Sequence, residues 1–182
     1  MKIIPTNNEK TFDSNVLLVT KTDLKGKIIY ANRGFMKIVG IDEDVLIGAP
    51  HSIIRHPDMP KIIFKYLWEY LQRGDEIHAY VKNICADGSY YWVIANVTPS
   101  HKIKRFSGGR RMQASDNEEE EEVVGYHSSR RSPSPQALAI IKPLYENLLQ
   151  AEKSGGLAAS DKIMQDLLKE KGVDYDEFIL SF

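Results

Sequence analysis

The sequence has only one cysteine, Cys85, so no disulfide can form within the chain. A reducing compartment such as the cytoplasm fits this composition best. The sequence also has no apolar run that approaches the roughly 20 residues needed to cross a bilayer. The polar segment 1–10 lacks the apolar core of a secretory signal. We therefore expect a soluble protein that acts by contact or through a diffusible ligand, without inserting into a membrane.

An excess of one charge is missing as well, because the formal net charge is −1. Such a chain has no global field that attracts nucleic acid. Basic residues between His101 and Arg111 are soon followed by the acidic run Glu118–Glu122, which cancels a basic patch, so no nucleic-acid partner is expected.

Motifs of catalysis are also absent. The sequence has no G-x-S-x-G, P-loop or H-E-x-x-H motif, and its five histidines do not pair with Cys85 at the spacing of a metal site. The protein is therefore not expected to be an enzyme.

Apolar runs separated by turn residues predict five strands and several helices. The strands are expected at Val16–Thr20, Ile28–Asn32, Glu76–Ile84, Tyr90–Pro99 and Val123–Arg131. Between the second and third strands, the pattern predicts a short helix capped by Asn32, another after Asp42, and an amphipathic helix from Pro60 to Gly74. This order is typical of an α+β fold, in which an antiparallel sheet carries helices on one face.

The chain divides by composition into three parts. We expect a flexible N-terminal segment at 1–12, a central domain at 13–131 and a helical tail at 132–182. The charged insertion 101–122 has little to bury and is interpreted as an extended, mobile hairpin loop.

Helical spacing in the tail places Leu138, Ile141, Tyr145 and Leu148 on one apolar seam. Gly155-Gly156 should break this helix, and Ser160 can cap a second one. Two roles for the seam remain open, since it can pack on the central domain or bind a partner.

The stretch "RHPDMP" concentrates Arg55, His56 and Asp58 directly before the amphipathic helix. One interpretation is structural, with Asp58 capping the helix and forming an ion pair with Arg55. The other is that a cationic fork, an imidazole and the nearby Trp68 together hold a planar, phosphate-bearing ligand. The residues alone identify a ligand-binding α+β module and no more.

Four segments make the sequence recognisable: "YANRGFMKIVGI", "LIGAPHSIIRHPDMPKIIFKYLW", "VKNICADGSYYWVIANVTPS" and "GYHSSRR". Together they resemble the PAS domain of bacterial aerotaxis receptors, which binds FAD, over about Asp13 to Arg131. The tail segment "PLYENLLQAEKSGG" resembles the short PAS proteins of bipartite energy-taxis systems, in which sensor and membrane-bound transducer are separate chains.

The resemblance implies the PAS fold and a set of FAD-site residues. Arg55, His56 and Asp58 match family residues whose loss removes FAD. Further matching positions line, border or lie close to the same pocket: Asn32, His51, Trp68, Asn83 and Trp92. Ile77 stands where the family usually has a tryptophan near the flavin.

The resemblance thus implies a cytoplasmic FAD sensor that reports redox, oxygen or energy state to a separate chemotaxis transducer. Such a sensor would associate with the membrane only peripherally, through that partner. It could also form a homodimer. Two alternatives stand beside it. One is a PAS sensor for haem or another small molecule, with His51 or His56 as axial ligand to haem, and the other is a ligand-free interaction module.

Overall fold

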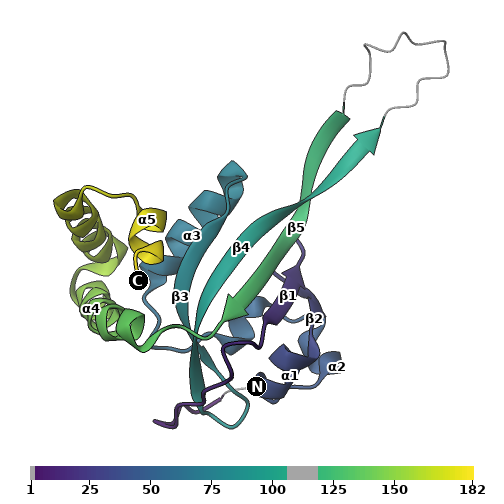
Figure 1. Cartoon of the computed structure of the whole chain (residues 1–182), viewed down its shortest axis with the longest axis horizontal. Helices are drawn as coiled ribbons and strands as arrows, with labels where there is room; N and C mark the ends of the chain where they lie inside the picture. The colour runs from purple at the N-terminus through teal and green to yellow at the C-terminus, as the bar shows by residue number, and fades with distance from the viewer. Residues whose placement is uncertain (1–2, 106–118) are drawn as a thin grey trace.

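The computed structural model describes residues 3–105 and 119–182, and its centre is a five-stranded antiparallel sheet (Figure 1). The strands are β1 (Leu18–Thr22), β2 (Ile28–Ala31), β3 (Ile77–Ile84), β4 (Tyr90–Arg105) and β5 (Glu119–Arg131). Their order in the sheet is β2-β1-β5-β4-β3. The predicted α+β fold with a five-stranded antiparallel sheet is confirmed.

The charged insertion differs from its prediction, because both flanking strands continue into it. Lys102 pairs in register with Glu122, and Ile103 pairs with Glu121. Opposite charges across a ladder stabilise strand pairing, so the basic and acidic runs suit a hairpin better than a loop. The two strands project well beyond the body of the domain (Figure 1). The rest of the predicted loop, 106–118, lies outside the described residues.

Four helical elements follow β2 in the chain. They are α1 (Arg33–Val39), α2 (Glu43–Leu46), the 3-10 helix η1 (His51–Ile54) and α3 (Lys61–Arg73). As predicted, the Asn32 side chain caps α1 by accepting from the Phe35 amide, and Gly40 ends the helix in a left-handed conformation. The largest fully buried side chains of these helices and the sheet form one core, which includes Phe35, Ile63 and Ile77.

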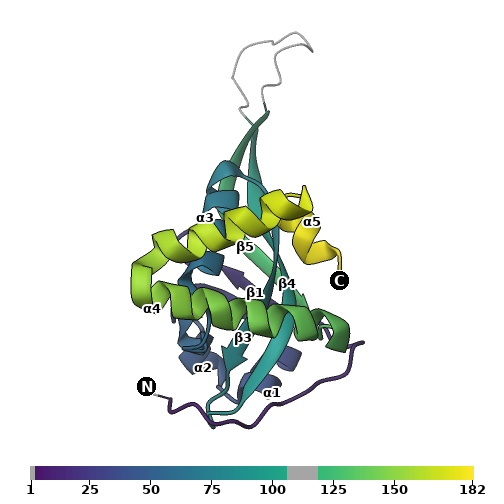
Figure 2. The ribbon, with the colours of Figure 1, turned by 90° about the vertical axis from the view of Figure 1, so that its left-hand side faces the viewer.

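The tail forms α4 (Pro135–Lys171) and α5 (Tyr175–Leu180). Gly156, with φ 69° and ψ −165°, divides α4 into two helical halves, so the predicted break is confirmed. Ser160 does not cap the second half and lies buried within it. Figure 2 shows the two halves of α4 crossing in front of the sheet.

The apolar seam of the tail packs on the central domain, which is the first of the two roles left open by the sequence. Ile141, Tyr145 and Leu148 are at most 2% exposed. The Tyr145 hydroxyl donates to the Tyr80 carbonyl at 2.8 Å. The centres of the Tyr145 and Trp92 rings are 6.0 Å apart. The tail therefore covers the sheet face on which Trp92 lies.

The N-terminal segment, which the sequence predicts to be flexible, runs along the turn between β3 and β4. The Thr6 amide donates to the Gly88 carbonyl at 2.8 Å, and the Lys10 amide donates to the Tyr90 carbonyl at 2.7 Å. Strand β5 pairs with β4 only from Ile94 onward, so the Tyr90 carbonyl is left for the N-terminal segment to bond.

Candidate functional site

A cavity of about 290 Å³ lies between α3, the segment 50–55 and the sheet. Its apolar walls come from helix α3 on one side and strands β3 and β4 on the other. Leu67, Trp68 and Leu71 project from α3, and Val81, Ala95 and Val97 project from β3 and β4. Two opposed apolar walls with a few polar groups between them are typical of a site for a small organic ligand.

Arg130 forms the polar end of this cavity and is only 4% exposed. Its Nη2 donates to Thr20 Oγ1 at 3.0 Å and to His51 Nε2 at 2.7 Å. Among the described residues, Nη1 has no hydrogen-bond partner and the guanidinium has no carboxylate partner. Burial lowers the pKa of Arg130 to about 10, so the side chain remains a cation at neutral pH. A buried cation without a counter-charge is costly unless a ligand supplies the missing acceptor.

His51 supports Arg130 as a neutral ring. Loss of hydration, together with repulsion from the neighbouring Arg130 charge, lowers the pKa of His51 to about 3. Because the ring is unprotonated at neutral pH, its Nε2 can accept the bond from Arg130.

Two further polar atoms of the cavity wall lack a well-formed hydrogen bond within the described residues. Asn83 Nδ2 and Ser128 Oγ are buried and form no hydrogen bond within the described part of the chain. Buried polar groups are normally paired, so these two groups and Arg130 Nη1 are available to a ligand or to water.

The "RHPDMP" stretch forms an extra edge beside β3. Arg55 pairs with Asn83 in an antiparallel bridge, and the His56 amide donates to the Lys82 carbonyl at 3.3 Å. The Arg55 guanidinium stacks on the Phe64 ring, 3.5 Å from its centre, and lines the exposed side of the cavity. The backbone thereby joins the mouth of the cavity directly to the strand that carries Asn83.

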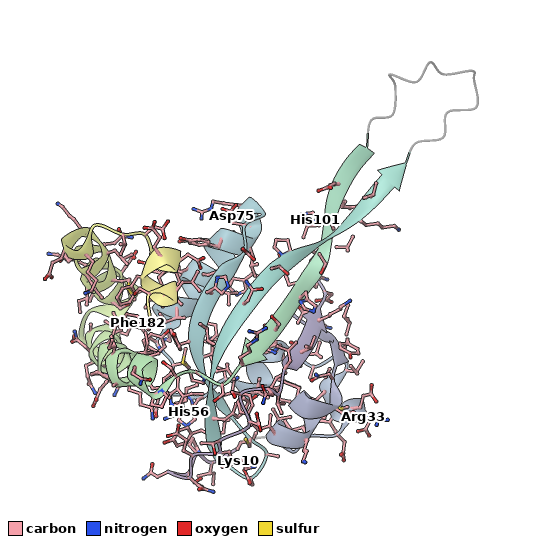
Figure 3. The ribbon with its side chains drawn as sticks, viewed as in Figure 1. Lys10, Arg33, His56, Asp75, His101 and Phe182 are labelled. Atoms are coloured by element: carbon pink, nitrogen blue, oxygen red, sulfur yellow. The ribbon has the colours of Figure 1, made fainter. Side chains whose placement is uncertain are left out.

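His56 and Asp58 lie outside the cavity. His56 is 3% exposed, and its Nδ1 accepts from the Asp58 amide at 3.1 Å. Figure 3 places His56 at the lower end of the sheet. Asp58 is exposed, and its Oδ2 pairs with Lys82 Nζ at 2.7 Å. These two residues hold the mouth segment against β3, so their effect on a ligand would be indirect.

Two structural predictions for Asp58 are wrong. It forms no ion pair with Arg55, which stacks on Phe64 instead. It also does not cap α3, because Met59 and Pro60 intervene and Pro60 occupies the cap position without a side-chain bond. The cap comes from Glu152 in the tail, whose carboxylate accepts from the amides of Lys61 and Ile62.

Three other sequence-predicted positions lie apart from the cavity. Asn32 uses its side chain on the Val19 and Phe35 amides and the Leu17 carbonyl. Trp92 lies between Tyr91 and Val93 on β4, and strand alternation sends it to the tail side of the sheet. Ile77 is fully buried in the core. Of the predicted site residues, the cavity thus brings together His51, Arg55, Trp68 and Asn83.

The sequence interpretation missed Thr20, Ser128 and Arg130. The segment "GYHSSRR" carried the signal, because Tyr126, Ser128 and Arg130 alternate on one face of β5 and all line the cavity. Polar residues at alternate positions next to an apolar core indicate a polar site.

Comparison with known proteins agrees with this geometry. Residues 28–108 match the family model described as the PAS fold. The aerotaxis receptor of Escherichia coli (strain K12) is 34% identical over 131 residues, which cover 72% of this chain and 22% of the receptor. The chain carries a PAS domain of the aerotaxis receptor family. It spans about a fifth of the receptor's length.

Two solved structures are similar to this chain. A Light-Oxygen-Voltage domain studied with a flavin analogue has a TM-score of 0.51 and 17% identity, and the match covers 72% of this chain and 86% of that one. A PAS domain from Colwellia psychrerythraea has a TM-score of 0.49 and 18% identity, with coverage of 64% and 86%. No helix in the described part of this PAS protein is long and apolar enough to cross a membrane.

Proposed function

We propose that this PAS domain binds FAD in the cavity and reports redox, oxygen or energy state to a separate membrane-bound chemotaxis transducer. The observation that carries the proposal is the unpartnered Nη1 of the buried Arg130. A flavin ring presents carbonyl oxygens and ring nitrogens that can accept from such a donor. The relationship to the aerotaxis receptor supports the signalling role.

Two features of the cavity support a flavin ligand: its opposed apolar walls and its unpartnered donors. The apolar walls suit the faces of a planar ring, while Asn83 Nδ2 and Arg130 Nη1 supply donors for its polar edge. Arg55 at the mouth is placed to pair with a phosphate, for which a guanidinium is well suited.

Bound FAD supplies reversible electron uptake. The Arg130 cation stabilises negative charge close to its Nη1, and neutral His51 keeps the guanidinium in place without adding charge. A change at Asn83 reaches the mouth through the Arg55 bridge and reaches Lys82 through the strand. A signal from the proposed ligand would thus pass to the surface along a short covalent and hydrogen-bonded path.

The test is an absorption spectrum of the purified protein, with the extracted cofactor identified by chromatography. Flavin bands and recovered FAD are expected. A Soret band would instead indicate haem, and a colourless protein that does not take up added FAD would contradict the proposal.

A matched pair of variants tests the role of Arg130. Arg130→Met should lower FAD affinity by about one to two decades, because a charge-assisted bond is lost. The fold should survive, since an apolar side chain can replace a buried charge with little loss of stability. Arg131→Met, at the next, exposed position of β5, should keep its FAD. Equal FAD affinity in the two folded variants would remove Arg130 from the site.

A further inference from the structure

Helix α3 has no capping side chain of its own. The first amides of a helix lack partners within it, and Pro60 at the cap position provides no side-chain acceptor. Glu152 fills this role from a point 90 residues later in the chain. Its Oε2 accepts from the Lys61 amide at 3.0 Å and its Oε1 from the Ile62 amide at 2.9 Å.

The second half of α4 holds the same helix through another carboxylate. Asp161 accepts from Lys65 Nζ at 2.6 Å and from the Tyr66 hydroxyl at 2.7 Å. Ser160 Oγ donates to Glu152 Oε1 at 3.2 Å and so links the two halves across the Gly156 break. We call Glu152 and Asp161 the carboxylate clamp.

The clamp and the cavity use different groups of α3. Glu152 binds the first backbone amides of the helix, and Asp161 binds the side chains of Lys65 and Tyr66. Phe64, Leu67, Trp68 and Leu71 line the cavity. One helix of 13 residues therefore lies between the tail and the cavity. A shift of α3 would change its contacts with the clamp and the shape of the cavity wall at the same time.

We propose that the carboxylate clamp couples the tail to the cavity wall, so that tail docking fixes α3 in its ligand-competent position. Glu152 and Asp161 act as positioning residues, since neither lines the cavity. The identity of the ligand rests on the proposed FAD function, but the coupling to the cavity wall does not. If tail docking raises the affinity for a ligand by some factor, thermodynamic linkage requires that the ligand raise the equilibrium constant for tail docking by the same factor.

The first experiment needs no ligand. Trp92→Phe leaves Trp68 as the one tryptophan of the full chain, and its quenching by acrylamide reports the cavity wall. In this background, Glu152→Gln places a side-chain NH2 group against one of the backbone amides that Glu152 binds, so one hydrogen bond is lost. We expect stronger quenching of Trp68 and faster hydrogen exchange over 61–66 and 157–171. Glu146→Gln, an exposed carboxylate on the same helix, is the matched control and should change neither.

Asp161→Asn gives a second variant if Glu152→Gln fails to fold. Looser exchange in the tail with unchanged Trp68 quenching would overturn the coupling, as would identical behaviour of Glu152→Gln and Glu146→Gln. If the unmodified chain binds FAD, Glu152→Gln should weaken binding at least fivefold, at the low end of common allosteric couplings. If it does not bind FAD, the proposed function fails while the quenching comparison still decides the coupling.

Discussion

At the residue scale, the most informative group is the buried Arg130 cation, whose Nη1 has no partner among the described residues. Arg130 is held by Thr20 and a neutral His51, so the protein fixes its position without neutralising its charge. An unpaired buried charge lowers the stability of the empty domain. The lost stability is recovered when a ligand provides a hydrogen-bond acceptor. Arg55 differs, because it lies at the mouth and stacks on Phe64 while keeping contact with solvent.

Arg55→Ala should therefore weaken FAD binding with little effect on folding. We expect a loss on the order of 1.5–3 kcal/mol, or about one to two decades in affinity, because one charge-assisted bond disappears. Flavin occupancy and thermal stability are measured on the same samples. Arg33→Ala, an exposed arginine at the start of α1, is the control. Full occupancy in the folded Arg55→Ala protein would count against a ligand role.

Cys85 should give no light-induced bond to flavin. It is fully buried at the end of β3, its amide donates to the Ser89 carbonyl, and it is not among the cavity residues. Burial also raises the pKa of its thiol, which leaves less reactive thiolate. Blue light applied to the FAD-loaded protein should cause no reversible bleaching. Bleaching that recovers in the dark and disappears in Cys85→Ala would contradict this expectation.

At the scale of elements, sequence reasoning succeeds where the controlling residues are neighbours. Asn32 and Gly40 define α1 from positions next to its ends, and their roles follow from local rules. The start of α3 could not be predicted this way, since its cap, Glu152, is distant in sequence. Trp92 lies apart from the cavity, and its position could not be derived from local rules because the face it occupies depends on strand register. Arg130 could have been predicted from sequence, because Ser128 and Arg130 stand at alternate positions of β5 and so share one face of the strand.

The tail seam should contribute strongly to stability. Leu148 is fully buried, so Leu148→Ala should cost about 2–5 kcal/mol in the free energy of unfolding. Leu157 lies on the same helix but is 42% exposed, and Leu157→Ala should cost well under half as much. Urea unfolding of both variants gives the comparison. Similar small losses would mean that the tail detaches before the domain unfolds.

The projecting hairpin should be dispensable for folding. Ile103 is 49% exposed and Lys102 is also exposed, so the described part of the hairpin beyond His101 buries little. Replacing 102–122 by an Asn-Gly turn joins His101 to Val123, which already pair. The melting temperature should stay nearly unchanged. A fall of many degrees would show that this region packs on the domain.

At the scale of the whole molecule, stability should fall on mild acidification. The pKa of His51 is lowered to about 3, chiefly by loss of hydration, and burial also lowers the pKa values of His56 and His127. Below about pH 6.5, the unfolded chain takes up protons that the folded chain excludes. The stabilisation is therefore complete above that pH and is lost as pH falls toward the folded pKa values.

For His51 alone we expect a loss of roughly 1–2 kcal/mol between pH 7 and pH 5. Urea unfolding at the two pH values should show a smaller difference in His51→Gln than in the unmodified chain. His101→Gln, at an exposed position, should retain the full difference. An undiminished pH effect in His51→Gln would assign the titration to other groups.

Both borders of the sheet body are covered by other parts of the chain. On the β2 side, the Ile28 amide donates to the Ala49 carbonyl and Lys27 pairs with Pro50. On the β3 side, Arg55 pairs with Asn83 and the His78 amide donates to Asp176. Another chain therefore finds little template there for strand addition. Beyond Val97, which pairs with Ile77 at the start of β3, the β3 side of β4 has no partner strand within the described residues, and charged positions such as Lys102 disfavour indiscriminate growth into aggregates there.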